Sequence, residues 1–138
     1  MLPEGYFLQK FFDNLNAAGI RYAVLRNYES LPFDTGGSDL DIIINPGDEA
    51  LTRAVVREAV RSVGGVAIGI AESTGFFKIY TFGKNSGVIK QWWGICLDFN
   101  VGLYFRGFCL LDENITWPLR YHHGIAVLED GFAGVLGV

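Results

Sequence analysis

The sequence has little of several features that mark particular classes of protein. Its 138 residues include only two cysteines, Cys96 and Cys109, which are too few for a disulfide framework, so we expect a reducing, cytoplasmic setting. No apolar run reaches the ~18 residues that a membrane-spanning helix needs, and we expect no membrane span. The first residues also lack the basic flank and small-residue cleavage site of a signal peptide.

Positive charge is scarce as well. Eleven Lys and Arg residues face fifteen Asp and Glu residues, which gives a formal net charge of -4 at pH 7. Non-specific binding to nucleic acid needs an excess of positive charge on some face, and this balance argues against it. Half of the residues are hydrophobic, which is enough for one core and argues against disorder. We expect a single domain over residues 1–138, and the apolar residues up to Val138 predict that it is the N-terminal part of a longer protein.

The hydrophobic pattern predicts helices early in the chain and mostly strands after them. Phe7, Phe11 and Leu15 recur at helical spacing, whereas the later segments are short apolar runs between turn residues. The expected helices span 5–18 and 46–63, and a loop is expected over 26–38. The expected strands span 22–25, 40–44, 66–70, 76–82, 88–93, 95–101 and 124–128. This order predicts an α+β fold, with helices packed on one face of a mixed β-sheet.

An acidic motif begins the second expected strand. Asp39 and Asp41 stand two residues apart, and because side chains alternate across a strand, both carboxylates project from one face. Two like charges this close repel unless a cation lies between them or one carboxylate takes a proton. A divalent cation removes the repulsion, and carboxylate oxygens are the ligands that Mg²⁺ prefers. Taken alone, the pair also fits an ordinary polar strand start beside a turn.

A third carboxylate strengthens the metal hypothesis. Asp98 lies in the otherwise apolar segment 95–101, where an ionised side chain is costly unless it is paired or binds a metal. If this segment lies beside the first acidic strand, the three carboxylates form a cluster that can hold one or two Mg²⁺ (or Mn²⁺) ions against a triphosphate. The alternative is a satisfied carboxylate on an edge strand. Cys96 shares the strand parity of Asp98, so it either lines the same site or is a small buried side chain.

Over roughly residues 5 to 101 the pattern resembles the nucleotidyltransferase superfamily of the DNA-polymerase-β type. Ser38-Asp39-Leu40-Asp41-Ile42 matches the family's two acids around one apolar residue, and Asp98 matches its third acid on a later strand. Residues 25–32 look like a subgroup of uncharacterised bacterial nucleotidyltransferase-like proteins. The resemblance implies a nucleotidyltransferase-like fold, an NTP substrate such as ATP, and an Mg²⁺ or Mn²⁺ cofactor. It also implies catalytic and metal-binding roles for the three carboxylates, and transfer of a nucleoside monophosphate to an acceptor that the sequence does not identify.

The sequence departs from the family pattern after the first strand. Where the family has Gly-Ser, this chain has Arg26-Asn27. These side chains can contact phosphate through guanidinium and amide donors, or Arg26 can pair with one of the two neighbouring acids and take the place of a metal. Gly37 and Ser38, which follow Gly36, are expected to supply backbone and hydroxyl donors to the nucleotide as an anion-binding turn, although a sharply turning loop also explains these glycines.

Two other functions fit parts of the same pattern. A non-catalytic nucleotide-binding or regulatory domain would keep the fold without the chemistry, and Arg26-Asn27 favours it. Asp39-Leu40-Asp41 also resembles the metal-binding Asp-x-Asp of sugar-nucleotide-dependent glycosyltransferases. In those domains the motif usually follows several parallel βα units, and here only one expected strand precedes it.

Overall fold

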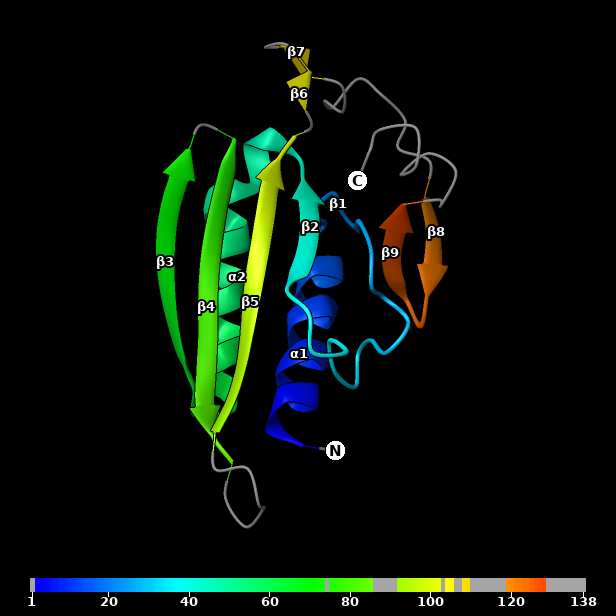
Figure 1. Ribbon diagram of the computed structural model, residues 1–138. Coiled ribbons are helices and arrows are strands. Elements are labelled where there is room, and N and C mark those ends of the chain that lie inside the picture. The colour runs from blue at the N-terminus through cyan, green and yellow to red at the C-terminus, as the bar shows by residue number, and fades with distance from the viewer. Residues whose placement is uncertain are drawn as a thin grey trace.

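The computed structural model describes residues 2–73, 75–85, 92–102, 104–105, 108–109 and 119–128. The elements, in chain order, are α1 (Pro3–Ala17), β1 (Tyr22–Val24), β2 (Leu40–Ile44), the short 3-10 helix η1 (Pro46–Asp48), α2 (Glu49–Ser62), β3 (Val66–Ser73), β4 (Phe76–Lys84), β5 (Trp92–Val101), β6 (Tyr104–Phe105), β7 (Phe108–Cys109), β8 (Leu119–His122) and β9 (Ile125–Leu128). Together they form an α+β fold, as the sequence predicts (Figure 1).

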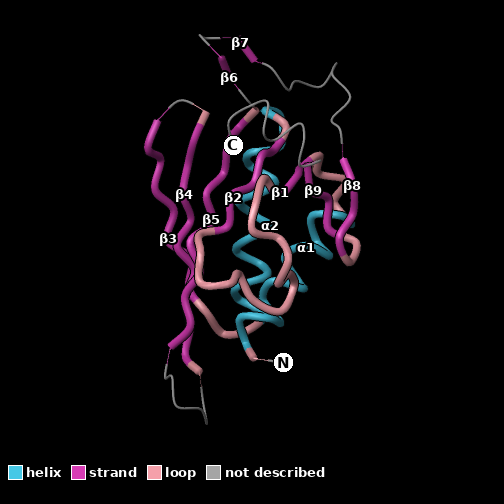
Figure 2. Tube along the Cα trace, turned by 45° about the vertical axis from the view of Figure 1, so that its right-hand side comes forward, coloured by secondary structure: helices cyan, strands magenta, loops and turns pink. Residues whose placement is uncertain are grey.

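One mixed sheet of seven strands organises the fold. Its strands lie in the order β3-β4-β5-β2-β1-β9-β8, and β6 and β7 form a separate two-stranded sheet. β3, β4 and β5 make an antiparallel meander, β2 runs parallel to β5, and β1 runs antiparallel to β2. Both described helices pack on the same side of this sheet (Figures 1 and 2). Among the described residues, the other side of β3, β4 and β5 therefore carries no helix.

Helix α1 supplies the aromatic half of the core. Pro3 occupies its first turn, where a missing N–H costs nothing, and Gly19 with a φ of 68° follows its end. Phe7 stacks on Trp93 of β5 with ring centroids 5.5 Å apart, and Phe11 meets the edge of Phe99 at 6.3 Å. Burying each such ring stabilises the fold by roughly 1.5–3 kcal/mol. These rings fix α1 across β5, the strand that carries Asp98.

Helix α2 covers the outer part of the same face. Val55, Val56, Ala59 and Val60 are buried against the sheet. The helix ends at Ser62, and Gly64, with a φ of 70°, reverses the chain into β3. Because α2 and β3 are joined by so short a turn, the helix packs near β3, and in Figure 1 it lies behind β4.

The expected elements and the described ones agree closely, with one correction among the strands. Separate strands over 88–93 and 95–101 are wrong for the part that the structure describes. Trp92 to Val101 form one continuous strand, because Gly94 stays in the ladder opposite Phe82 instead of breaking it. Residues 88–91 lie outside the described residues. β8 was not expected, and it pairs with the expected last strand.

Candidate functional site

Two parallel strands bring the predicted carboxylates together. β2 and β5 are in register so that Asp41 lies opposite Asp98, and the neighbouring pair joins Leu40 to Leu97. Paired residues share a face of a sheet, and both leucines are buried in the core. The two aspartates therefore lie on the face without helices. The sequence made the carboxylate cluster conditional on these two strands being neighbours, and they are; β5 is an interior strand, so Asp98 is not an edge-strand carboxylate.

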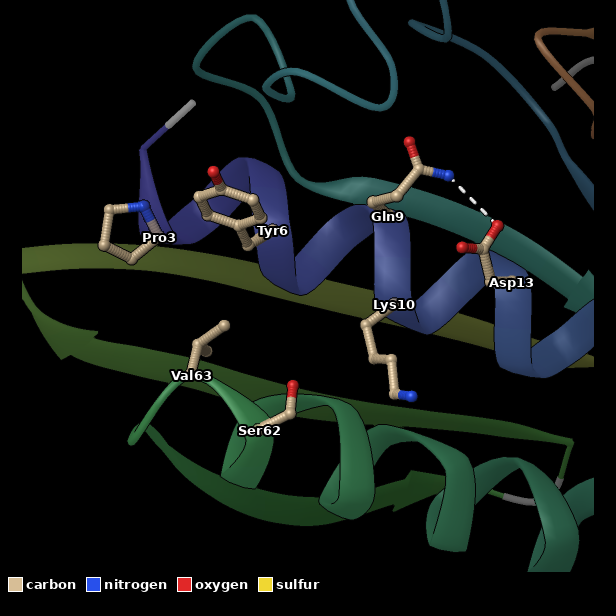
Figure 3. A pocket seen from close by; sticks show the side chains of 7 residues that line it. All are labelled: Pro3, Tyr6, Gln9, Lys10, Asp13, Ser62 and Val63. Carbon is tan, nitrogen blue, oxygen red and sulfur yellow. Dashed lines mark hydrogen bonds between the residues drawn. The ribbon is translucent and has the colours of Figure 1, made fainter.

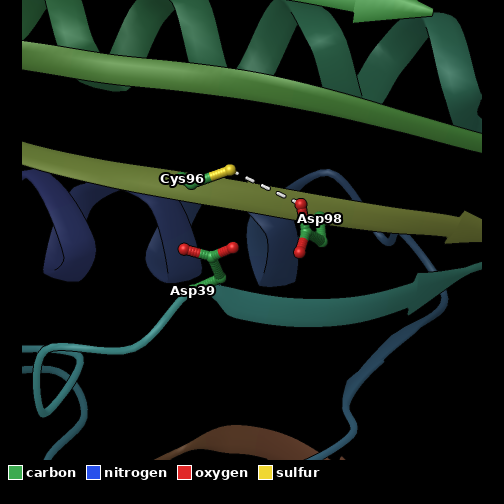
Figure 4. Close-up of side chains that lie close together, drawn as sticks. All are labelled: Asp39, Cys96 and Asp98. Atoms are coloured by element: carbon green, nitrogen blue, oxygen red, sulfur yellow. Dashed lines mark hydrogen bonds between the residues drawn. The ribbon is translucent and has the colours of Figure 1, made fainter. Parts of the chain in front are cut away.

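Asp39 completes the cluster together with a thiol. It stands just before β2, and its carboxylate lies close to Asp98 and Cys96 on β5 (Figure 4). One oxygen of each carboxylate and the Cys96 Sγ all lie within 4.8 Å of one another. The Cys96 thiol donates a hydrogen bond to Oδ1 of Asp98 at 3.4 Å. Asp98 is buried and Asp39 is exposed, so the cluster lies at the surface with one deep carboxylate.

Two cationic side chains partly neutralise the cluster. Nε of Arg26 lies 2.9 Å from Oδ2 of Asp41, which is the pairing that the sequence allowed as a substitute for a metal. Nζ of Lys78 lies 3.5 Å from Oδ1 of Asp98, because the two residues are directly opposite in the β4–β5 pairing. Among the described residues, Asp39 has no ion-pair partner. The site thus keeps one uncompensated carboxylate at its open side.

Burial, with the crowding of negative charge as a second cause, raises the pKa of two groups of the cluster. Burial raises the pKa of Asp41; the Arg26 guanidinium opposes this effect, and the charge and hydrogen bond of Asp98 and the charge of Asp39 add to it. Burial, followed by repulsion from the same two aspartates, raises the pKa of the Cys96 thiol to about 12. A bound cation would relieve both effects, because it favours the ionised form of each neighbour.

A hollow of about 380 Å³ opens beside the cluster. The residues that line it are Glu4, Asp34, Thr35, Gly36, Gly37, Ser38, Asp39, Gly94, Ile95 and Cys96. Its rim is a turn in which Gly36 and Gly37 have φ values of 67° and 81°, a region that favours glycine, and Oδ1 of Asp34 accepts a 2.7 Å hydrogen bond from the Gly36 N–H. None of these lining residues is basic. A phosphate group placed here would need a cation between itself and the carboxylates.

The structure does not bring every predicted site residue to this hollow. Asp39, Gly37 and Ser38 line it, whereas Asp41 and Asp98 do not. Arg26 reaches Asp41 from outside the hollow, and Asn27 is exposed and does not line it. Glu4, from the first turn of α1, is a lining residue that the sequence analysis missed. No local pattern signals this position, because only the packing of α1 under the loop places it there.

A larger hollow lies elsewhere and holds no such chemistry. It measures about 510 Å³ and lies between α1 and the end of α2, within the helix layer (Figure 3). Its lining residues are Pro3, Tyr6, Gln9, Lys10, Asp13, Ser62 and Val63. Its polar groups partly satisfy one another, since Nε2 of Gln9 donates a 3.0 Å hydrogen bond to Oδ1 of Asp13. We therefore take the smaller, acidic hollow as the candidate site.

Comparison with known proteins does not identify the function of this site. No protein-family model, curated protein or solved structure matches this chain. The resemblance to nucleotidyltransferases therefore stays a prediction. In the described part of the chain, neither helix combines the length and apolar character needed to cross a membrane.

Proposed function

We propose that this domain is a divalent-cation-dependent nucleotidyltransferase that transfers a nucleoside monophosphate from an NTP to a hydroxyl-bearing acceptor. The observation that supports this most strongly is the register that sets Asp41 opposite Asp98 on adjacent parallel strands. Asp39 lies next to Asp98, and a hollow of about 380 Å³, which Asp39 and Cys96 line, opens beside them. Carboxylates clustered beside a cavity are the arrangement with which proteins hold a metal against a phosphate chain.

The carboxylates of the donor set fit a hard divalent cation such as Mg²⁺ or Mn²⁺, whereas the Cys96 thiol beside them is not a ligand that such a cation prefers. Asp39 offers an oxygen with no competing ion pair among the described residues, and the charges of Asp98 and Asp39 add to the effect of burial, which raises the pKa of Asp41. The hollow has no basic lining residue that could neutralise a triphosphate by itself. When bound, the cation supplies the charge neutralisation that the phosphates and the leaving pyrophosphate require.

The side chains of the site then have separate tasks. Asp39 and Asp41 hold the cation, and the Gly37-Ser38 turn donates to phosphate oxygens. Asp98 accepts the proton of the acceptor hydroxyl or holds a second cation. The acceptor oxygen forms a bond to the α-phosphorus while the bond to the pyrophosphate oxygen breaks in line with it. The rate enhancement comes mainly from positioning the two reactants.

In this scheme Arg26 pairs with Asp41 in the free protein and contacts phosphate in the nucleotide complex. Its side chain is 53% exposed and held at one point by Asp41, so it can turn away at small cost. If Asp41 were to hold a cation instead, the Arg26 guanidinium would be free to contact phosphate oxygens, which it binds well. The residue that departs from the family pattern would thus stabilise the empty site and then contact the nucleotide.

A non-catalytic binding or regulatory domain is the second candidate. The Arg26–Asp41 and Lys78–Asp98 ion pairs favour it, because they neutralise two carboxylates without a metal. We do not propose a glycosyltransferase, since β1 precedes the acidic motif and runs antiparallel to β2. Both remaining candidates allow a nucleotide to bind. Only the nucleotidyltransferase turns the nucleotide over in the presence of a divalent cation.

The test is a thermal-shift panel of NTPs with and without Mg²⁺ or Mn²⁺. A ligand at a hundred times its Kd adds about 2.7 kcal/mol of stability, which raises the Tm of a domain this size by several degrees. We expect a cation-dependent shift in the wild type and in the exposed control variant Glu58→Gln, and none in Asp41→Asn relative to its own ligand-free Tm. Release of pyrophosphate by the wild type then separates the enzyme from the binding domain.

Substitution of Arg26 distinguishes a phosphate contact from a block of the site. If Arg26 contacts phosphate, Arg26→Ala weakens the cation-dependent shift; if it only blocks the site, the same variant strengthens the shift. The absence of a shift with every nucleotide in both the wild type and Arg26→Ala would contradict nucleotide binding at this cluster.

A further inference from the structure

Strand β3 forms an open edge of the sheet. It is the last strand in the order, and it pairs with β4 and with no other described strand. The register between them is regular from Val66 to Ala71 and shifts only between Ala71 and Ser73. Proline and charged residues are the usual means by which an edge strand discourages pairing. Glu72 near the end of β3 is charged, but residues 66–70 contain neither a proline nor a charged residue. This edge is therefore suited to accept another strand.

The two faces of this edge differ sharply. Val66, Ile68 and Ile70 lie on the face without helices and are 50%, 50% and 44% exposed. The alternate positions, Ala67 and Gly69, face α2. A side chain on Gly69 would meet the guanidinium of Arg53, because a Cβ there would lie 3.3 Å from its Nη1. The small residues keep space open between the strand and the helix.

Helix α2 lines that space with arginines. Arg53, Arg57 and Arg61 follow one another at four-residue intervals, and they line two adjoining hollows of about 150 and 220 Å³ over the β3 edge. Arg53 is engaged, since its Nη2 lies 3.1 Å from Oε1 of Glu49 and its Cζ lies 4.0 Å from the centre of the Phe77 ring. Arg57 and Arg61 are exposed and have no ion-pair partner among the described residues.

We propose that β3 binds an extended peptide as an added strand, with acidic side chains at every second position. Its acidic side chains would enter the two hollows and meet Arg57 and Arg61, and its apolar side chains would extend the surface of Ile68 and its neighbours. The spacings agree: four helical residues rise about 6 Å, and two strand residues advance about 6.6–6.8 Å. Main-chain hydrogen bonds give such a complex its affinity, and alternate pockets give it specificity.

Charge complementarity selects this occupant over a second copy of the chain. An antiparallel β3–β3 pair would bring two arginine rows to the same seam, where they repel. The residues that such a copy would direct toward α2 are Gly and Ala, which offer no counter-charge. The edge is also separated from Asp98 by β4, so this proposal does not depend on the proposed transferase activity.

The test measures binding of a fluorescein-labelled Glu-Val-Glu-Val-Glu-Val-Glu peptide by anisotropy at low ionic strength, where surface charges are least screened. We expect saturable binding that is at least tenfold weaker for two controls. One is a peptide of the same composition with its four Glu residues in a block. The other is the alternating peptide with N-methyl groups on the amides of both edges, which cannot donate to the β3 edge in either strand direction. Equal binding of all three would show a charge effect only and would overturn the proposal.

Variants of the helix locate the contact. In Arg57→Glu/Arg61→Glu we expect at least a tenfold loss of affinity for the Glu-Val peptide and a gain for its Lys-Val counterpart, whereas Lys10→Glu on α1 leaves both unchanged. If circular dichroism shows that the double variant does not fold, the comparison between the alternating peptide and its N-methylated form tests the proposal by itself. No binding up to millimolar peptide, or a self-associating chain whose dimer the peptide does not dissociate, would refute the assignment.

Discussion

Cys96 is expected to be an unreactive thiol although its side chain is only half-buried. Burial and the charges of Asp98 and Asp39 raise its pKa from an ordinary value of 9.0 to about 12. At pH 8 this lowers the thiolate fraction from roughly 10% to roughly 0.01%, and only the thiolate is the nucleophile. Alkylation should therefore be more than tenfold slower than for the unfolded chain, because the higher nucleophilicity of a more basic thiolate offsets only part of the loss in thiolate fraction.

The assay follows iodoacetamide modification by mass spectrometry at pH 8, in a Cys109→Ser background so that one thiol is observed. The reference rate comes from the same chain in denaturant. Asp98→Asn should accelerate the reaction, because it removes the charge and the hydrogen bond with which that carboxylate raises the pKa, but only in part, since burial is the larger cause. The distant variant Asp13→Asn should leave the rate unchanged. A folded-state rate within tenfold of the denatured rate would refute this account of the cluster.

Two further predictions concern stability. The folded-state pKa of Asp41 is raised, so its protonated form is favoured on folding, and this contribution is present below an unfolded pKa near 3.8 and lost as the pH rises. Asp41→Asn has a neutral side chain at every pH, so it should raise the Tm at pH 7 by up to a few degrees. This gain in Tm should shrink in acid, and a lower Tm at pH 7 would contradict the prediction. Gly83→Ala should lower the free energy of unfolding in urea by about 1–3 kcal/mol, because its Cβ would lie 2.5 Å from Nε1 of Trp93. The control Gly94→Ala, whose Cβ would have its nearest contact at 3.7 Å, should be nearly neutral. Equal stabilities of the two variants would show that the Trp93 ring moves aside.

Local periodicity in the sequence was enough to predict several parts of this protein. The stripe of α1 predicted its buried side, and the two-residue spacing of Asp39 and Asp41 predicted that both carboxylates share a face. These features depend only on 3.6-residue and two-residue repeats, which neighbouring residues fix by themselves. The loop between the first two strands was also predicted from local residues, namely its glycines and proline.

The partners of these residues were settled only by long-range packing. Nothing near Lys78 in the sequence indicates that it pairs with Asp98, because that contact depends on the register of the β4–β5 hairpin. The sequence offered the pairing of Arg26 with Asp41 as one of several possibilities, and the turn after β1 selected it.

The edge of the sheet shows the same division. The alternation of small and β-branched residues from Gly65 to Ile70 is visible in the sequence, and so is the spacing of the arginines in α2. That the two patterns face each other across an open edge follows from strand order and helix packing. A sequence specifies which face of an element is apolar, since that is a local repeat, but which elements become neighbours depends on how the whole chain buries its apolar surface at once.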